Sequence, residues 1–424
     1  MEHQGFRKYF ANTTWMLIEQ ILRLIAGFFV GVWVIRYLGP QQFGIFSYIL
    51  AFVSIFSSIA RLGLDSILVR DLVNEPNKRN DYLGTAFWLR FVSSVFMILA
   101  IFISSLIMSN DKLTNLYLLI VASGLIFQSF DVIDSYFQSK VQYKFISLCK
   151  ITQLFISSLI KIYFVITKAD LIYFVITYLI DQLTITIAMY FAYKSQNIGE
   201  FFFHFNLKKA QKLLSDSWPL ILSSIAITIY MRIDQVMIKQ LLGNHSLGMY
   251  SAAMKVSEVL FIIPVIVANS VTPSIIASRK DNYALYIKKI EILCKSMIIF
   301  SLLLAIVITF SSEFLINFLF GQQYYQAAQI LVIQSWSCIL ICMGIVSNIY
   351  LIGENWTKKS FYRTSLGAVF NVLLNIILIP TYGVIGAVFA TLISQFIVNF
   401  AYDFFDKEMD DILRVKINSL FLWR

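Results

Sequence analysis

Long apolar segments dominate this chain and limit it to a membrane fold. A helix needs about 20 mostly apolar residues to cross a bilayer, and about twelve stretches meet that length. Only 14% of the residues are charged, against about 25% in soluble domains, so a water-soluble enzyme is excluded. We predict an all-α integral membrane protein. The segments are Thr14–Tyr37, Gln42–Leu62, Leu83–Met108, Thr114–Asp134, Phe145–Thr167, Leu171–Tyr193, Trp218–Leu242, Met249–Ala277, Leu293–Phe320, Ala327–Ile352, Phe361–Pro380 and Val384–Phe404.

The basic residues between these segments alternate from one side to the other. One set of connections holds nearly all of them, whereas the opposite set contains only Lys112 and Lys168. The positive-inside rule therefore predicts that both termini are cytoplasmic. The net charge of +10 then reflects membrane orientation and contact with anionic lipids, so no nucleic-acid partner is expected. The basic connections include Arg7 and Lys8, Arg70 to Arg79, Lys140 and Lys144, Lys194 to Lys212, Arg279 to Lys289, Lys358 and Lys359, and Lys407 to Arg424.

The sequence contains an internal repeat. Leu38-Gly39-Pro40-Gln41-Gln42-Phe43-Gly44 matches Leu242-Gly243-Asn244-His245-Ser246-Leu247-Gly248, about half a chain length later. Both copies connect an odd-numbered segment to the next one on the outer side. The halves are therefore expected to be parallel repeats related by an axis along the membrane normal.

This repeat divides the chain into two six-helix lobes. We predict an N-terminal lobe over 1–195, a cytoplasmic linker over 196–216, a C-terminal lobe over 217–404 and a cytoplasmic amphipathic tail over 405–424. In the tail, Ile412, Val415, Leu420, Phe421 and Trp423 are expected to lie in the membrane interface. Two such lobes around a central cavity can expose that cavity alternately to each side, which is the logic of a transporter.

Ionisable residues at membrane depth are costly and usually face a cavity or a partner. Cations outnumber acids among them, so the predicted cavity is cationic and suits an anionic substrate. Paired structural salt bridges are the competing interpretation, for Glu19–Arg23 and Lys255–Glu258 above all. Arg232 and Asp234, two residues apart, should face different directions. The candidate substrate-binding residues are Arg23, Arg232, Lys255, Arg90 and Glu19.

Three acidic residues are candidates for binding a coupling ion, either H⁺ or Na⁺: Asp181, Asp234 and Glu258. Arg36, Lys161 and Lys239 lie nearer the outer ends of their segments, where their side chains are expected to reach the interface.

No cofactor and no metal site are expected. Cys338 and Cys342 are one helical turn apart, but no histidine lies near them in the sequence. A Walker-A sequence is also missing, so this chain is not expected to hydrolyse ATP.

Three widely spaced motifs resemble those of Wzx-type polysaccharide flippases. Val34–Gly44 is similar to the turn after their first helix, and Leu62–Asp65 with Leu68–Arg70 is similar to the stretch after their second. Asn371–Ala387 resembles the run between their last two helices, Asn-x-x-Leu-Asn followed by Leu-Ile-Pro-x-Tyr-Gly. This family belongs to the multidrug/oligosaccharidyl-lipid/polysaccharide (MOP) exporter superfamily, whose fold is MATE-like.

The resemblance implies a transporter and no enzyme activity. Such flippases move an undecaprenyl-diphosphate-linked oligosaccharide, the repeat unit of O-antigen (lipopolysaccharide) or capsule, to the outer leaflet of the bacterial inner membrane. The partners it implies are this lipid-linked oligosaccharide, membrane lipids, a polysaccharide polymerase and a chain-length regulator. Related lipid II flippases bind the diphosphate with cations of the first and eighth helices, where Arg23 and Lys255 lie here.

Two alternatives remain open. The first is a multidrug exporter of the same fold, which would favour a carboxylate-dominated cavity for organic cations. The second is a membrane enzyme such as a polysaccharide polymerase, which would typically carry a large external loop that this sequence lacks.

Overall fold

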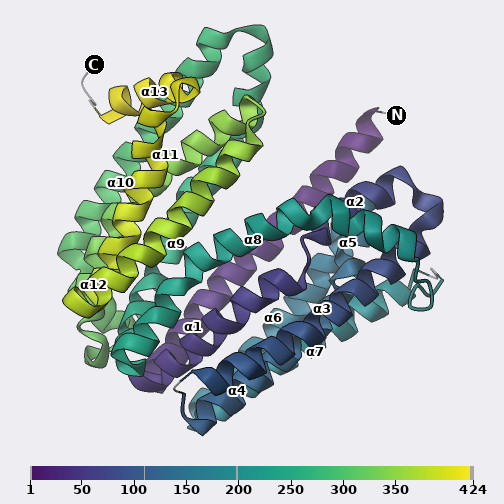
Figure 1. The fold of residues 1–424 in the computed structure, drawn as a ribbon, viewed down its shortest axis with the longest axis horizontal. Helices are drawn as coiled ribbons and strands as arrows, with labels where there is room; N and C mark the ends of the chain where they lie inside the picture. The colour runs from purple at the N-terminus through teal and green to yellow at the C-terminus, as the bar shows by residue number, and fades with distance from the viewer. Residues whose placement is uncertain (1, 109, 197–198, 421–424) are drawn as a thin grey trace. The chain divides into compact units, whose positions relative to one another are not determined.

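The computed structural model describes residues 2–108, 110–196 and 199–420, and every regular element in these ranges is a helix (Figure 1). Ten helical segments are long and apolar enough to span a membrane. The helices of the first half are α1 (Glu2–Ala60), α2 (Leu64–Asn74), η1 (Pro76–Lys78), α3 (Arg79–Ile107), α4 (Lys112–Ser123), η2 (Gly124–Asp131), α5 (Val132–Ser139), α6 (Tyr143–Ile166) and α7 (Leu171–Lys194). The later ones are α8 (Leu207–Leu242), α9 (Asn244–Asp281), α10 (Tyr283–Phe320), η3 (Gln322–Tyr324), α11 (Ala327–Gly353), α12 (Thr357–Asn399), η4 (Ala401–Phe405), η5 (Lys407–Met409) and α13 (Asp410–Leu420).

Ten helical segments accommodate all of the predicted apolar stretches because two of them are broken by a kink. Helix α1 covers 59 residues and would be about 88 Å long if it were straight, far more than the bilayer thickness. Its backbone leaves helical geometry at Gly39, and that of α12 does so at Gly383. Each of these helices therefore contains two of the predicted segments.

The chain divides into two compact units whose boundaries differ from the predicted lobes. Unit 1 comprises 1–38 and 48–228, and unit 2 comprises 39–47 and 229–424. The division falls within α8 rather than in the predicted linker over 196–216. The short segment 39–47, from the first half of the sequence, packs with unit 2.

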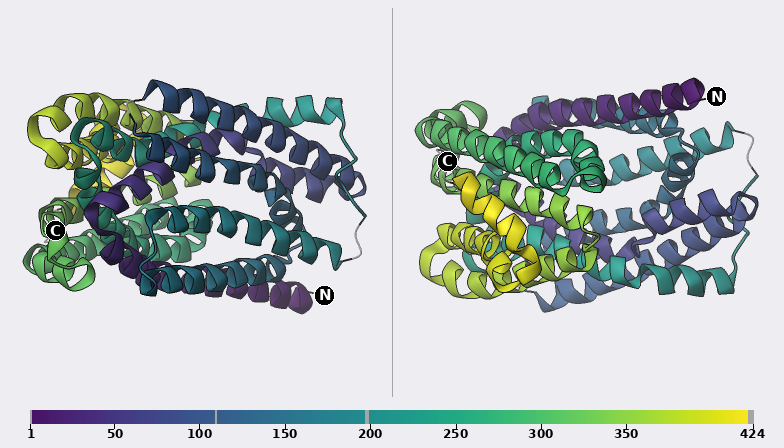
Figure 2. Two further views of the ribbon diagram at one scale, coloured as in Figure 1. Left: turned by 90° about the horizontal axis from the view of Figure 1, so that it is seen from below. Right: turned by 90° about the horizontal axis from the view of Figure 1, so that it is seen from above.

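Unit 1 is a bundle whose helices run side by side in both views of Figure 2, in blue and teal. One buried cluster of this unit joins α2, α3 and α5 to the segment before α8, with Leu68, Leu83, Phe137 and Phe201 fully buried. The fourth predicted span is formed by α4, η2 and α5 in succession. Its central eight residues, Gly124–Asp131, have the tighter 3₁₀ winding.

In unit 2, α11 packs between α10 and α12 and also contacts α9. The buried cluster of this unit includes Ile290, Met297, Val346 and Tyr350. Large apolar residues on the outside of the helices, such as Phe310, Phe314 and Phe318 of α10, are more than two-thirds exposed. In a membrane protein such residues face lipid rather than water.

The two copies of the internal repeat have the same backbone conformation. Gly39 and Gly243, at matching positions, have φ 68°, ψ 171° and φ 87°, ψ 178°. A residue with a side chain rarely adopts this positive φ, so glycine is required at both turns. The two matching glycines of the sequence repeat thus share one backbone geometry.

The repeat turns also pack against each other reciprocally within unit 2. A Cβ atom added to Gly44 would lie 1.8 Å from the carbonyl oxygen of Asn244. One added to Gly248 would lie 1.9 Å from the carbonyl oxygen of Pro40. Gly44 corresponds to Gly248 in the repeat, and Pro40 corresponds to Asn244. The glycine of each turn therefore packs against the equivalent backbone carbonyl of the other turn.

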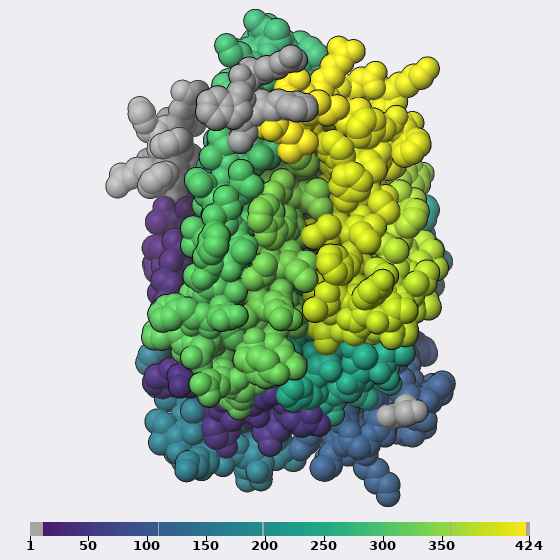
Figure 3. All heavy atoms as spheres, turned by 90° about the vertical axis from the view of Figure 1, so that its left-hand side faces the viewer, coloured from purple at the N-terminus to yellow at the C-terminus, as the bar shows by residue number. Residues whose placement is uncertain are grey.

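The C-terminal helix α13 corrects one prediction. Ile412 and Val415 are buried in the core of unit 2 against α10, rather than lying in the membrane interface. Figure 3 shows this C-terminal segment in yellow beside the green helices of unit 2. Leu420 is 44% exposed, and Phe421 and Trp423 lie outside the described residues.

A fully buried ion pair holds α13 in place. Lys416 Nζ lies 2.5 Å from Asp403 Oδ2 and donates a second hydrogen bond to the carbonyl oxygen of Asn399, 2.6 Å away. Neither charged side chain is exposed to solvent. Burial lowers the pKa of Lys416 below its ordinary value, whereas the Asp403 carboxylate opposes this shift.

We predict that Gly248→Ala destabilises the protein by about 1–3 kcal/mol, because the new methyl group would push the two repeat turns apart. Gly27→Ala is the matched control, since a Cβ there meets nothing within 4 Å. Thermal unfolding of the purified variants in detergent measures the difference. Equal stability of the two variants would contradict the close backbone contact.

A second prediction concerns the Lys416–Asp403 pair. Lys416→Met leaves a buried carboxylate without its cation and should cost about 3–5 kcal/mol of stability. The double variant with Asp403→Leu should recover most of that loss. Arg414→Met, on the exposed face of the same helix, is the control in the same unfolding assay. A double variant as unstable as Lys416→Met would argue against the ion pair as the cause.

Candidate functional site: buried charges in both units

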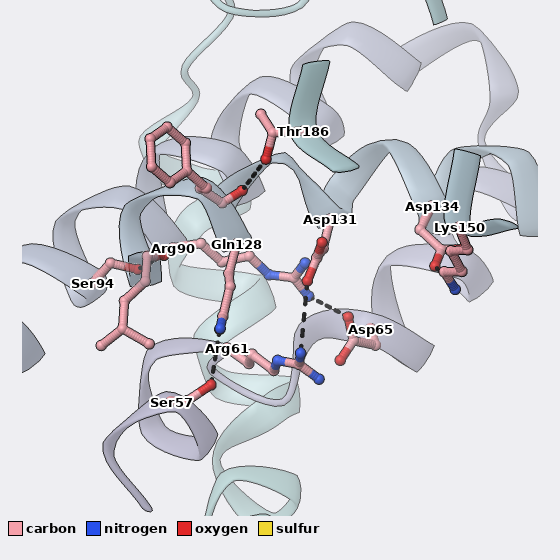
Figure 4. Close-up of polar contacts among 12 residues, drawn as sticks. Ser57, Arg61, Asp65, Arg90, Ser94, Gln128, Asp131, Asp134, Lys150 and Thr186 are labelled. Carbon is pink, nitrogen blue, oxygen red and sulfur yellow. Dashed lines mark hydrogen bonds and ion pairs between the residues drawn. The ribbon is translucent and has the colours of Figure 1, made fainter. Parts of the chain in front are cut away.

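Four charged side chains gather in unit 1 where α2, α3 and η2 meet (Figure 4). We call Arg61, Asp65, Arg90 and Asp131 the arginine–aspartate cluster. Arg90 of α3 is 1% exposed, and its Nη2 atom donates to Asp65 Oδ1 at 2.6 Å. The Nε and Nη1 atoms of Arg90 are also buried, and neither has a hydrogen-bond partner among the described residues. The guanidinium group therefore keeps two donor atoms for another ligand.

The second arginine of the cluster is more accessible. Arg61 lies between α1 and α2, its side chain is 50% exposed, and its Nη2 atom is 3.9 Å from Asp131 Oδ2. The following residues, Leu62 and Gly63, have positive φ angles of 55° and 58°. This tight turn connects Arg61 to Asp65, so the same short segment supplies two charges of the cluster.

The 3₁₀ stretch η2 brings Asp131 and Gln128 to this cluster. Hydroxyl groups of neighbouring helices donate hydrogen bonds to backbone carbonyl oxygens of this stretch. Ser94 donates to Leu125 at 3.0 Å, and Thr186 donates to Phe127 at 3.3 Å. Ser57 donates to Gln128 Oε1 at 2.9 Å. A 3₁₀ stretch in the middle of a longer helix often marks a functional hinge or a strained sequence.

In unit 2, Asp234 of α8 is buried, and no ion pair joins it to a cation of the described residues. Its carboxylate accepts hydrogen bonds from Asn375 Nδ2 at 2.6 Å, Thr391 Oγ1 at 2.6 Å and Tyr250 Oη at 3.0 Å. The second amide atom of Asn375, Oδ1, is buried without a partner among the described residues. A carboxylate held only by neutral donors keeps its negative charge available for a bound cation.

Three other predicted residues form a second, half-exposed group in unit 2. Glu258 lies 3.7 Å from Arg232 and 4.0 Å from Lys255. One carboxylate therefore faces two cations, and the group has a net positive charge. Arg232 is in contact with Glu258 whereas Asp234 is buried among neutral side chains, as expected for residues two apart.

The remaining candidates are mostly engaged in ion pairs. Glu19 accepts a hydrogen bond from Arg23, whose side chain is 56% exposed. Asp181 accepts hydrogen bonds from Lys161 at 3.1 Å and Ser157 at 2.9 Å, which makes it a weak candidate for binding an ion.

Of the three cations expected at the outer interface, Arg36 is exposed, whereas Lys161 is paired with Asp181. Lys239 is only 8% exposed, so its interfacial position was predicted wrongly.

Sequence reasoning missed Arg61 and Asp131. Both lie within three residues of the end of a predicted apolar segment, and such charges are usually interfacial. Asp65 was noted only as part of a family motif. Arg61 and Asp131 nevertheless lie inside predicted apolar segments, and that position was the signal in the sequence that could have identified them.

Comparison with known proteins identifies the chain. Residues 34–329 match the family model described as polysaccharide biosynthesis protein. The chain belongs to this family. It is 24% identical over 409 residues to the capsular polysaccharide biosynthesis protein CapF of Staphylococcus aureus, which covers 94% of this chain and 99% of CapF. It is also 28% identical over 199 residues to the probable low-salt glycan biosynthesis flippase Agl15 of Haloferax volcanii, over 46% of this chain and 41% of that protein.

Solved structures show the same fold. An inward-facing MATE-family multidrug transporter of the MOP superfamily superimposes with a TM-score of 0.74 at 14% identity, covering 94% of this chain and 95% of the transporter. The lipid II flippase MurJ, in an inward closed conformation, gives a TM-score of 0.72 at 18% identity over 95% of this chain and 90% of MurJ. The predicted MATE-like, all-α membrane fold is therefore confirmed. The chain is therefore a multi-pass, all-helical membrane protein of the polysaccharide biosynthesis family.

Proposed function

We propose that this protein is a flippase for a diphosphate-linked lipid glycan. Membership of a polysaccharide biosynthesis family, together with the MOP fold, supports a lipid-linked glycan as the cargo. The observation that carries the diphosphate assignment is the buried Arg90, which has two guanidinium donors without a partner among the described residues. A phosphate group supplies several anionic oxygens that suit these donors.

The arginine–aspartate cluster can exchange partners without leaving a charge buried alone. Before substrate binds, Asp65 and Asp131 pair with Arg90 and Arg61. Phosphate oxygens would then fill the free positions of Arg90 and contact the half-exposed Arg61. Three other cations are further candidates for binding the substrate. In unit 2, Arg232 and Lys255 share one acidic partner, Glu258. In unit 1, the side chain of Arg23 is 56% exposed.

The finer assignment follows the family resemblance. We propose an undecaprenyl-diphosphate-linked repeat unit of capsule or O-antigen, moved to the outer leaflet of a bacterial inner membrane by alternating access, with both termini in the cytoplasm. The likeness to CapF favours capsule over O-antigen. A polysaccharide polymerase and a chain-length regulator would act on the translocated product.

Asp234 is the proposed residue for the coupling ion. The Asp234 carboxylate, the Thr391 hydroxyl and the unpartnered Asn375 Oδ1 are hard oxygen ligands that suit Na⁺, and the carboxylate alone suits H⁺. Binding of either ion would neutralise a charge that is costly in the membrane. Glu258 and Asp181 are less suited because both contact cationic side chains.

Export of organic cations is the second candidate function, because the MATE transporter shares the fold. The partly unsatisfied arginine and the excess cations around Glu258 disfavour a positively charged substrate. Transport of ethidium by the reconstituted protein, without movement of a diphosphate-linked sugar, would favour this alternative.

We predict that Arg90→Gln and Arg61→Gln each reduce flipping by about tenfold or more, because each removes charge-assisted hydrogen bonds to phosphate. The assay is movement of a fluorescent undecaprenyl-diphosphate-linked monosaccharide in proteoliposomes, followed by its protection from an impermeant quencher. Arg279→Gln is the matched control, since Arg279 already makes two hydrogen bonds to Glu354. Wild-type rates in both cluster variants would overturn the proposed diphosphate site.

We further predict that Asp234→Asn abolishes the response of flipping to an imposed Na⁺ or H⁺ gradient, because the amide has no charge for the ion to neutralise. The same proteoliposomes, loaded to create one gradient at a time, provide the measurement. Asp181→Asn is the control, because Lys161 already occupies that carboxylate. A gradient response retained in Asp234→Asn and lost in Asp181→Asn would assign the coupling to the other unit.

A further inference from the structure

A polar cavity lies in unit 2 where α10 ends and α11 begins. Its volume is about 510 Å³. The chain reverses there at Gly321, whose φ of 87° and ψ of 170° match the geometry of the two repeat turns. The lining residues come from the last two turns of α10, from η3 and the two residues after it, and from the first turn of α11: Glu313, Asn317, Gln322, Tyr325, Gln326, Ala328 and Gln329.

Most polar groups of this cavity are available to a ligand. Among the described residues, the side chains of Glu313, Asn317, Gln322 and Gln329 form neither a hydrogen bond nor an ion pair. Gln326 Nε2 donates to Tyr325 Oη at 3.1 Å, and the Tyr325 side chain is 68% exposed. The cavity thus combines several amides, one carboxylate and an accessible aromatic ring.

We propose that this cavity binds a sugar residue of a neutral or amino-sugar glycan. Side-chain amides can donate to and accept from neighbouring hydroxyl groups, and a carboxylate can accept from them. An aromatic ring can pack against the apolar face of a sugar. The lining contains no lysine or arginine, so phosphate is a poor ligand. It contains a single carboxylate, too few for the oxygen-rich coordination that a divalent cation requires. Glu313 would repel acidic sugars.

The cavity lies beside a lipid-facing surface of α10, which suits a glycan that is attached to a lipid. Glu313 and Asn317 line the cavity, whereas the residues next to them, Phe314 and Phe318, are 70% and 68% exposed. Two adjacent stripes of one helix therefore present a sugar-binding surface and a lipid-facing surface. A glycan in the cavity can remain attached to a lipid whose tail stays in the bilayer.

The side of the membrane gives the cavity its place in transport. The alternation of basic connections puts the α10–α11 turn on the outer side. This inference rests on the proposed flippase function, because a translocated glycan emerges on that side. The cavity would hold the sugar portion of the substrate at the outer surface of unit 2.

The test is saccharide binding by the purified full-length protein in nanodiscs. The probes are a panel of free disaccharides: neutral, N-acetylated, amino and uronic-acid forms, observed by saturation-transfer difference NMR. We expect wild type to bind neutral, N-acetylated or amino forms and to exclude uronic acids. Tyr325→Ala and Glu313→Gln should each weaken binding about tenfold or more. Tyr382→Ala changes another exposed tyrosine of unit 2 and should bind as wild type.

Two results would overturn the proposal: no disaccharide of the panel binds wild type, or both cavity variants bind as tightly as Tyr382→Ala. Glu313→Gln removes only a charge, so it remains informative if Tyr325→Ala fails to fold. The flipping assay on the same samples separates the two hypotheses. Flipping without saccharide binding rejects the cavity alone, whereas cavity-dependent binding without flipping of the diphosphate-linked sugar rejects the proposed function alone.

Discussion

The requirement that charges in hydrocarbon must be compensated governs this structure. A lipid environment offers no water to replace a missing partner, so charged side chains in long apolar helices pair with one another or with neutral donors. Lys161 with Asp181 and Glu19 with Arg23 follow this rule. Arg90 and Asp234 depart from it in opposite senses. Within the described part of the chain, Arg90 keeps two donors unfilled and Asp234 has no cationic partner, so these two side chains differ in the sign of the charge left available.

The surroundings of Arg90 and of Asp234 hold these charged side chains in place in different ways. In unit 1, a 3₁₀ stretch and a tight turn bring Asp131 and Asp65 to the arginines, and hydroxyl groups of Ser94 and Thr186 bond to carbonyl oxygens of the tightened helix. In unit 2, Asn375 and Thr391 lie on the two helical parts of α12 that meet at Gly383, and they and Tyr250 of α9 supply the hydrogen bonds to Asp234. The group proposed to bind an anion and the group proposed to bind a cation are thus held in place by different structural elements.

The sequence predicted the helical segments well, because the length of an apolar stretch is a local property. The matching glycines of the repeat also have matching backbone conformations, but the units divide within α8 rather than in the predicted linker. The sequence also predicted that Arg232 and Asp234 diverge, which follows from helical periodicity alone. It did not predict the arginine–aspartate cluster, since Arg61 and Asp131 lie at segment ends where charges are ordinarily interfacial. The burial of Ile412 and Val415 was missed for a related reason: an amphipathic helix has the same pattern whether its apolar face meets lipid or protein.

The reciprocal contact of the repeat turns has a consequence for the origin of this architecture. Each turn presents to the other the same surface that it receives, Gly44 against Asn244 and Gly248 against Pro40. This is the defining property of an isologous interface between identical subunits. A six-helix chain with one such turn would carry a self-complementary surface for pairing with a second copy. Gene duplication and fusion would then preserve a dimer contact as an internal one.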